Sequence, residues 1–347
     1  MSTSRYRGSL AVWVLLILYA SLYPFWPLRS PPDDAIAAMF GRPRYLVAFD
    51  VGLNIVAYAP LGMLAASHFL ASGKAHPLAR AVAFGVALSF AMECFQLFIP
   101  GRVASLYDVL ANATGTFLGV IAFADPIHSV ATRPLVEWRD GVLVPGAWGD
   151  AGLMLVALWL IAQLNPALPF FGAGNIPAVG EESRIAGPLE WSAVAVGVCG
   201  FGLFISALLR GDQGSLRVTL ALLSVALWLK FVGASFLLQP HFTDEWVTSG
   251  RLVGLAVGLA ALYPLRRLPR AARTYVAILA ILAGALLAKI FGAYSTLDEL
   301  LRVFRWPYGQ LANFATLTRY LHELWPFAAL IFMIALFLRD RRAAVSK

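Results

Sequence analysis

Long apolar stretches separated by short polar segments run the whole length of the chain. A membrane-spanning helix needs about 20 mostly apolar residues, because the hydrocarbon core of a bilayer is about 30 Å thick. Ten stretches have this character: residues 9–28, 46–70, 80–100, 107–124, 150–168, 188–209, 216–238, 247–265, 274–293 and 324–338. The pattern therefore predicts an all-α fold, a polytopic transmembrane helical bundle of about ten spans.

Two of these spans depart from the simple pattern. The stretch 107–124 is short and contains Asp108, Asn112 and Thr114, which lower its hydropathy. The stretch 324–338 is also short, so we expect that helix either to tilt or to begin earlier in the chain. The first stretch lacks a small-residue cleavage site, and we interpret it as a retained span and not as a signal peptide.

Composition excludes the main alternatives to a membrane protein. Hydrophobic residues make up 60% of the 347 residues and charged residues only 13%, whereas soluble domains have about 45–50% apolar and about 25% charged residues. A disordered chain would need low hydrophobicity, and two cysteines are too few for a disulfide scaffold. The net charge of +8 is what basic loops between spans provide, so we expect no nucleic-acid partner.

The distribution of basic residues predicts the orientation. With a cytoplasmic N-terminus, sixteen of the 27 Lys and Arg residues fall in inside segments and nine in outside segments. This bias favours both termini in the cytoplasm. The reverse orientation stays open, because Arg29, Arg42 and Arg44 all lie in the first outer loop.

The chain is expected to fall into three parts along its length. Residues 1–124 form a four-helix membrane unit, residues 125–149 a cytoplasmic connecting loop, and residues 150–347 a six-helix extension. Within the extension, apolar residues recur at helical spacing between 297 and 306. This segment is either an amphipathic helix at the membrane interface or an ordinary helical loop packed on the bundle.

Charged and amide side chains recur at helical spacing in the second, third and fourth spans. They are Asp50 with Asn54, Glu93 with Gln96, and Asp108 with Asn112. Residues three or four apart share one face of a helix, so each pair projects from one side of its span. Gly115 and Gly119 continue the fourth span with a pattern that lets helices approach closely.

In the favoured orientation these faces all meet near the outer surface of the membrane. Arg102 and Ser105 lie in the turn between the third and fourth spans. We expect a polar pocket that opens outward, in which Arg102 is the counter-ion and its fork of donors suits a carboxylate or phosphate. The predicted binding residues are Asp50, Asn54, Glu93, Gln96, Arg102, Ser105, Asp108 and Asn112.

The same cluster has a purely structural alternative. Buried polar groups also lock transmembrane helices together, whereas ionisable residues within a membrane most often mark function. Both interpretations stay open at this point. No catalytic group, cofactor or metal site is expected, since the five histidines are scattered and none has metal-ligand spacing with another His or Cys.

Four sequence blocks in the first third of the chain resemble the VanZ family. The blocks are YASLYPF at 19–25, NIVAYAPLG at 54–62, ECFQLFIPGR at 93–102 and SLYDVLANATG at 105–115. These are small bacterial integral membrane proteins named after a glycopeptide (teicoplanin) resistance determinant. The resemblance covers about residues 10–124 and implies the bacterial cytoplasmic (inner) membrane and a role in the cell envelope, without naming a reaction.

Several functional hypotheses follow. The first is recognition of an envelope lipid or lipid-linked glycan head group, with membrane lipids and a lipid-linked envelope precursor as partners. The second is a proton-coupled transporter in which Glu93 or Asp50 titrates, and a structural subunit of a membrane complex is a further alternative. An enzyme ranks last, because no second activating group accompanies the carboxylates. Outside the cluster, Lys230 lies deep in a span, where pairing with an acid from another span is one open interpretation, whereas Lys289 is expected to extend toward a membrane surface.

Overall fold

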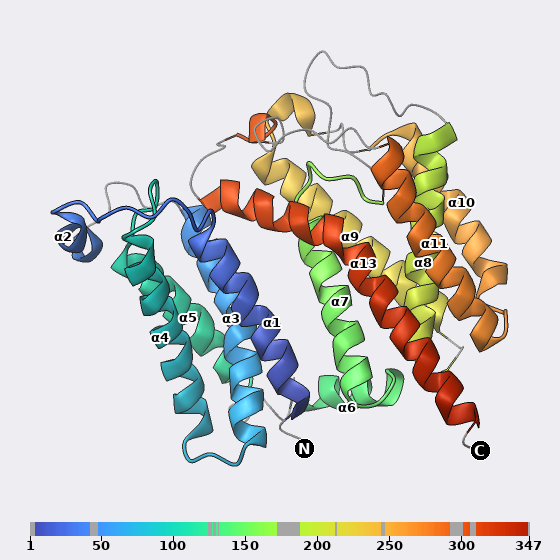
Figure 1. Ribbon diagram of the computed structural model, residues 1–347, viewed down its shortest axis with the longest axis horizontal. Coiled ribbons are helices and arrows are strands. Elements are labelled where there is room, and N and C mark those ends of the chain that lie inside the picture. The colour runs from blue at the N-terminus through green and yellow to red at the C-terminus, as the bar shows by residue number, and fades with distance from the viewer. Residues whose placement is uncertain are drawn as a thin grey trace. The chain divides into compact units, whose positions relative to one another are not determined.

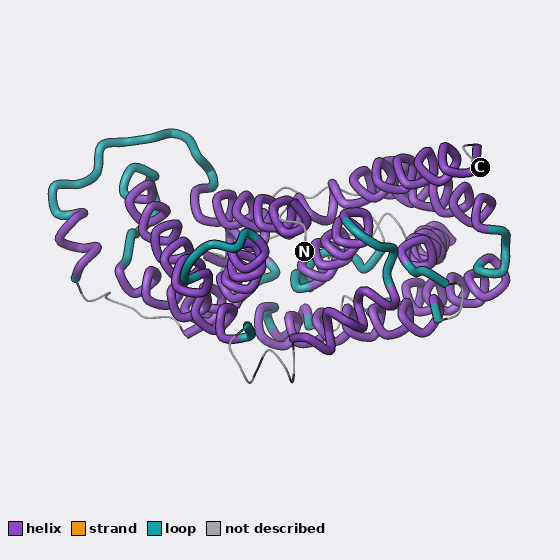
Figure 2. Tube along the Cα trace, turned by 90° about the horizontal axis from the view of Figure 1, so that it is seen from below, coloured by secondary structure: helices purple, strands orange, loops and turns teal. Residues whose placement is uncertain are grey.

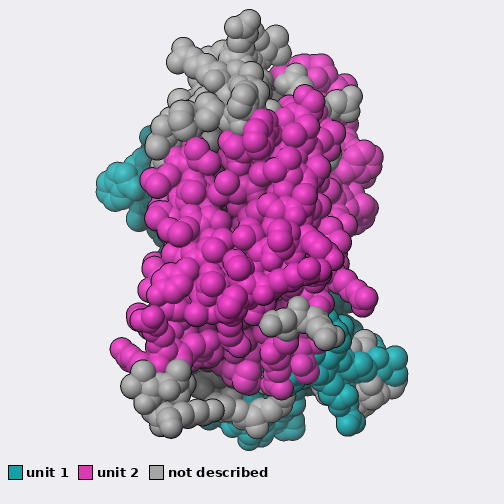
Figure 3. Space-filling model, turned by 90° about the vertical axis from the view of Figure 1, so that its right-hand side faces the viewer, with its two compact units in different colours: residues 1–140 teal, residues 141–347 magenta. Residues whose placement is uncertain are grey.

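The computed structural model describes residues 4–41, 48–123, 127, 130, 132–171, 188–211, 214–243, 247–291, 301–305 and 310–345. The tube in Figure 2 shows that these residues form helices joined by loops, with isolated bridges only at Leu143–Leu209 and Leu238–Phe304. The all-α prediction is therefore confirmed. The chain divides into two compact units, unit 1 at Met1–Asp140 and unit 2 at Gly141–Lys347, which Figure 3 colours separately.

Helices of unit 1 correspond to the first four expected spans, with one short addition. They are α1 (Ser4–Leu22), α2 (Ala35–Phe40), α3 (Ala48–Ala71), α4 (Pro77–Gln96) and α5 (Leu106–Ile121) (Figure 1). The segment expected to connect the two parts, residues 125–149, contains helix α6 (Arg133–Val142) and the first residues of α7.

Unit 2 contains a helix at each of the six remaining expected spans. They are α7 (Ala147–Gln163), α8 (Pro188–Leu208), α9 (Ser215–Leu237), α10 (Ser249–Leu265), α11 (Arg270–Phe291) and α13 (Gln310–Val345), with a short 3-10 helix, η2 (Pro240–Phe242), after α9. Helix α13 begins at Gln310, well before residue 324, as one of the two alternatives for this short span expected. Polar residues such as Thr318, Arg319 and Glu323 lower the hydropathy of its first turns, so this part of the helix lies outside the apolar stretch.

Six of the described helices are long and apolar enough to cross a bilayer: α3, α4, α8, α9, α11 and α13. Helices α1, α5, α7 and α10 are apolar but have a shorter apolar part. The protein is thus a polytopic helical membrane protein. The described helices also agree in position with every stretch that hydropathy selected.

Close contact between α3 and α5 holds unit 1 together. A Cβ atom added to Gly119 would lie 1.9 Å from the main-chain oxygen of Ala59, and one added to Gly115 would lie 2.3 Å from that of Ile55. From the opposite helix, a Cβ on Gly62 would lie 2.1 Å from the oxygen of Thr116. The small-residue pattern therefore does what the sequence predicted, because only glycine lets the two backbones come this near.

In unit 2 the central element is α8. In its most apolar 18-residue segment 72% is buried, compared with 28–33% in the corresponding segments of the other five long helices. Aromatic rings fill the space around it: Phe201 stacks on Trp159 of α7 with centroids 4.1 Å apart. Trp325 of α13 donates from Nε1 to the main-chain oxygen of Leu155 at 2.7 Å, which satisfies the indole inside an apolar core.

Lys230 is buried in α9 with 1% of its surface exposed. Its ammonium donates to the main-chain oxygens of Asn165 at 3.1 Å and Leu168 at 2.7 Å. Both carbonyls belong to the residues that follow α7, and the oxygen of Asn165 also accepts from the amide of Leu168 at 3.4 Å. The ammonium thus binds main-chain acceptors beyond the C-terminal end of α7, which carries negative partial charge. Among the described residues these main-chain oxygens, and not an acid from another span, are the partners of Lys230. The side chain of Lys289 lies outside the described residues.

The expected interfacial segment, residues 297–306, is described only at 301–305. There Val303 and Phe304 are buried, and the amide of Arg305 donates to the oxygen of Leu237 at 2.9 Å. These five residues pack against the end of α9. The choice between an interfacial helix and an ordinary loop falls on residues outside the described part.

Candidate functional site

The predicted site residues lie at one end of unit 1. In Figure 1 the last turn of α1, the first turns of α3 and the connection between α4 and α5 come together at the end opposite the α3–α4 turn. Hydrogen bonds join all four helices at this end. The structure thus brings together the helix faces that the helical spacing placed near one another. The individual contacts differ in what they join, as follows.

Asn54 and Asp108 join α3 to α5. Nδ2 of Asn54 donates to Oδ1 of Asp108 at 2.9 Å. Asp50 lies one turn before Asn54, close enough for its charge to act on Asp108. Asp50 and Asp108 are half-buried, and among the described residues neither carboxylate takes part in an ion pair within 4.0 Å. This pair is a partly accessible, acceptor-rich surface.

Glu93 fixes the start of α5. Its carboxylate, 3% exposed, accepts a hydrogen bond from the amide of Ser105 at 2.8 Å. Ser105 is the N-cap of α5, and its hydroxyl accepts from the amide of Tyr107 at 3.2 Å. A capping serine and a carboxylate thus satisfy amides that a helix start would leave unpaired. The acid on α4 thereby sets the position of Asp108 in the first turn of α5.

Arg102 binds the end of α1. Its Nη2 atom donates to the main-chain oxygens of Ala20 at 2.7 Å and Tyr23 at 3.3 Å. Burial lowers the pKa of Arg102, and the nearby carboxylates of Glu93 and Asp108 oppose that change. The charges of both carboxylates therefore act on the guanidinium. The sequence did not indicate that the same group holds α1 against the α4–α5 turn.

Gln96 and Asn112 are buried ties between helices. Nε2 of Gln96 donates to the oxygen of Ser21 in α1 at 3.1 Å. Nδ2 of Asn112 donates to the hydroxyl of Ser89 in α4 at 2.9 Å, one turn deeper than Asp108 and Glu93. The two side chains are 3% and 5% exposed. For these two residues the geometry fits the structural alternative, because each joins two helices away from the surface.

Comparison with known proteins identifies the part of the chain that carries this site. The model of the VanZ/LLP1 family matches residues 8–127. Residues 8–127 are a VanZ-like domain. No curated protein and no solved structure matches the chain, and the remaining helices are not assigned to a family. All eight predicted binding residues therefore belong to the VanZ-like domain, and the resemblance inferred from the four sequence blocks is confirmed.

The VanZ-like domain contains a further polar residue that sequence reasoning missed. Tyr58, 3% exposed, lies one turn after Asn54, and its hydroxyl is near Ser89 and Glu93. Neither this hydroxyl nor Oδ1 of Asn112 has a hydrogen-bond partner of normal geometry among the described residues. The spacing of Asp50, Asn54 and Tyr58 at every fourth position is the signal that points to Tyr58.

The cluster in the VanZ-like domain is rich in acceptors. Three carboxylates, those of Asp50, Glu93 and Asp108, accompany the single guanidinium of Arg102. Among the described residues no group of three or more His, Cys, Asp or Glu side chains is placed to hold a metal ion. The two half-buried carboxylates, those of Asp50 and Asp108, suit a partner that donates hydrogen bonds from hydroxyl, amide or ammonium groups.

Proposed function

We propose that the VanZ-like domain binds the polar head group of an envelope lipid or of a lipid-linked glycan in the bacterial inner membrane. The observation that carries this proposal is the half-buried pair of Asp50 and Asp108, which projects from two helices beside Asn54 and has no ion-pair partner among the described residues. Placing two carboxylates so close together at the end of membrane helices is costly unless a ligand or water satisfies them.

The chemistry of the cluster supports a sugar-like or amide-bearing head group. The carboxylates of Asp50 and Asp108 accept hydrogen bonds from hydroxyls and amides, and charge-assisted bonds of this kind are short and strong. Arg102, which lies beside Asp108, brings positive charge to the phosphate that joins such a head group to its lipid. A single ligand of this kind then pairs its hydroxyl or amide groups with the carboxylates and its phosphate with the guanidinium.

The surroundings of the cluster suit a ligand with a long hydrocarbon tail. Val56, Val103 and Leu110 are 65%, 78% and 56% exposed. They lie close in sequence to Asn54, Arg102 and Asp108. Exposed apolar side chains next to a polar cluster are typical of a membrane protein surface where a head group meets protein and the tail remains in lipid.

Isosteric substitutions test the proposal. Asp50→Asn and Asp108→Asn remove negative charge but keep the size of each side chain, and the amide introduced by Asp108→Asn retains an oxygen to accept from Asn54. The full-length protein is purified from neutral detergent, incubated with a total lipid extract of bacterial envelopes, and the retained lipids are measured by mass spectrometry. We expect each variant to retain about tenfold less of one glycosylated or amide-bearing lipid, equivalent to one lost charge-assisted bond of about 1.4 kcal/mol or more.

Asp33→Asn is the matched control, because Asp33 is an exposed acid of the same unit. It should leave lipid retention unchanged. If the Asp50 and Asp108 variants keep the full set of retained lipids, the binding proposal is wrong. A purely structural role for the cluster then gains support, and the ties made by Gln96 and Asn112 already fit such a role.

A further inference from the structure

Six arginines gather at one end of unit 2, away from the VanZ-like domain in sequence. They lie in the turn between α10 and α11 and in the last turns of α13, and they are Arg266, Arg267, Arg270, Arg339, Arg341 and Arg342. We call this set the arginine cluster. Figure 1 shows the α10–α11 turn and the end of α13 at the same end of unit 2.

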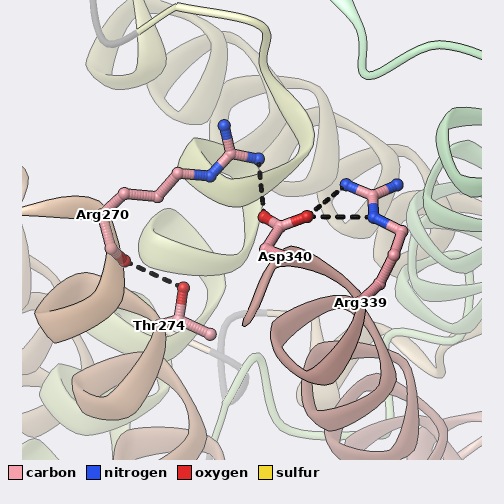
Figure 4. Close-up of polar contacts among 4 residues, drawn as sticks. All are labelled: Arg270, Thr274, Arg339 and Asp340. Atoms are coloured by element: carbon pink, nitrogen blue, oxygen red, sulfur yellow. Dashed lines mark hydrogen bonds and ion pairs between the residues drawn. The ribbon is translucent and has the colours of Figure 1, made fainter. Parts of the chain in front are cut away.

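A single carboxylate joins the two halves of the arginine cluster. Oδ2 of Asp340 lies 3.3 Å from Nη2 of Arg270, while its Oδ1 atom accepts from Nε and Nη2 of Arg339 at 2.9 and 2.6 Å (Figure 4). Thr274, also drawn in Figure 4, donates to the oxygen of Arg270 at 3.0 Å and is satisfied within α11. The contact fixes the start of α11 against the end of α13.

The arginine cluster keeps a large positive excess. Among the described residues Asp340 is the only carboxylate within 4.0 Å of any of its six guanidinium groups. Arg267, Arg270, Arg341 and Arg342 are exposed. Arg273, on the same turn, is buried and donates to the hydroxyl of Ser206 at 3.0 Å, so it is a structural residue and not part of the cluster.

Aromatic rings support the guanidinium groups. Arg266 and Arg267 lie 4.8 and 4.7 Å from the centroid of the Tyr263 ring, and Arg341 lies 5.2 Å from that of Phe337. Cation–π contacts of this kind hold a guanidinium at a ring face. Aromatic residues together with arginines at the ends of apolar helices are typical of the membrane–water interface.

Exposed apolar residues lead away from the arginine cluster along α11. Tyr275, Leu279, Leu282 and Leu286 recur every three or four residues and are each at least 40% exposed. The ring of Tyr275 contacts that of Phe337 at a centroid distance of 4.7 Å, which connects this stripe to α13 and to the cluster. The arginine cluster therefore has an exposed apolar stripe beside it along α11.

We propose that the arginine cluster is a binding site for the phosphate head group of an anionic phospholipid. Phosphate is recognised by guanidinium forks with bidentate geometry, and groups of basic residues next to transmembrane helices attract anionic lipids. The apolar stripe on α11 accommodates the acyl chains. The site is independent of the head-group proposal for the VanZ-like domain, because it uses different helices and the opposite sign of charge.

Lipid binding by the purified full-length protein tests this site. The protein in neutral detergent is titrated with phosphatidylglycerol and, separately, with phosphatidylcholine of the same acyl chains, and bound lipids are counted by native mass spectrometry. The unsubstituted protein is expected to prefer phosphatidylglycerol. The double variant R341Q/R342Q should lower phosphatidylglycerol binding by about fivefold per removed charge and leave phosphatidylcholine binding unchanged.

Three controls make the result decisive. R217Q/R302Q removes two exposed arginines elsewhere in unit 2 and should keep the preference. R341K/R342K preserves the charges and should keep most of it. Inorganic phosphate, added at constant ionic strength, should not displace the lipid. The proposal is overturned if R341Q/R342Q binds both lipids as the unsubstituted protein does, if R217Q/R302Q loses as much, or if inorganic phosphate competes, which would indicate a site for free anions.

Discussion

Arg102 and Lys230 both donate to main-chain carbonyls at the end of a neighbouring helix. Arg102 binds the end of α1, and Lys230 binds the residues that follow α7. Carbonyls in the last turn of a helix have no partner within it, those just after it lie outside the helical hydrogen-bond pattern, and hydrocarbon offers no water to either. A long cationic side chain donates to two such carbonyls at once and also interacts favourably with the negative end of the helix dipole.

The Lys230 contact can be tested by a single substitution. Lys230→Met keeps a long, unbranched side chain but removes the donor to the oxygens of Leu168 and Asn165, and Asn165 keeps only the amide of Leu168 at 3.4 Å. We expect the free energy of unfolding to fall by about 2 kcal/mol, because one buried acceptor loses its hydrogen bond and a second loses its shorter one. A thermal unfolding midpoint measured in detergent should drop accordingly. Lys74→Met, at an exposed position, should have little effect, and an unchanged midpoint for Lys230→Met would show that the contact adds no stability.

At the scale of helices, the contact between α3 and α5 positions the candidate site. Gly115 and Gly119 let the backbones meet below Asp108, which brings Asn54 within 2.9 Å of it. Glu93 then sets the start of α5 through Ser105. Any substitution that separates α3 from α5 is therefore expected to disturb both the fold of unit 1 and the geometry of its acidic pair.

Gly119→Ala tests that dependence. Its Cβ atom would lie 1.9 Å from the main-chain oxygen of Ala59, a contact that requires the helices to move apart. We expect a loss of stability of about 3 kcal/mol, comparable to a severe overpacking substitution, visible as a lower midpoint of thermal unfolding. Gly52→Ala on α3 is the control, since nothing lies within 4 Å of its added Cβ. The control should be neutral or stabilising by up to about 1 kcal/mol, and equal effects for the two variants would contradict the close contact.

Sequence patterns predicted the positions of these helices well, but they predicted the hydrogen-bond partners of the site residues only in part. Apolar runs and the spacing of Asp50, Asn54 and Asp108 are properties of side chains, so the sequence predicts spans and shared faces directly. The hydrogen bonds of Arg102 and Gln96 go to main-chain oxygens of α1. Every residue carries such an oxygen, so no residue type marks these partners. An earlier start of the last helix was one of two alternatives that the sequence offered, but its first residue could not be located, because polar side chains buried between helices lower hydropathy as much as exposed ones do.

At the scale of the whole molecule, the orientation in the membrane determines what each polar region can meet. Helix α4 has 20 residues, about 30 Å at 1.5 Å per residue, which matches the hydrocarbon core. This length predicts that the α3–α4 turn and the α4–α5 turn lie on opposite sides of the bilayer. The excess of basic residues in alternate loops predicts that the α4–α5 turn, with the candidate site, faces outward.

Cysteine labelling in intact cells tests this orientation. The chain has only two cysteines, and Cys94→Ala with Cys199→Ala gives a background without thiols. Val103→Cys in the α4–α5 turn and Lys74→Cys in the α3–α4 turn place single thiols at two exposed positions. A membrane-impermeant maleimide should label position 103 in intact cells and position 74 only after permeabilisation. The opposite pattern would place Asp50, Arg102 and Asp108 on the cytoplasmic side, where an outward-facing head group cannot reach them, and the proposed function of the VanZ-like domain would need a cytoplasmic ligand instead.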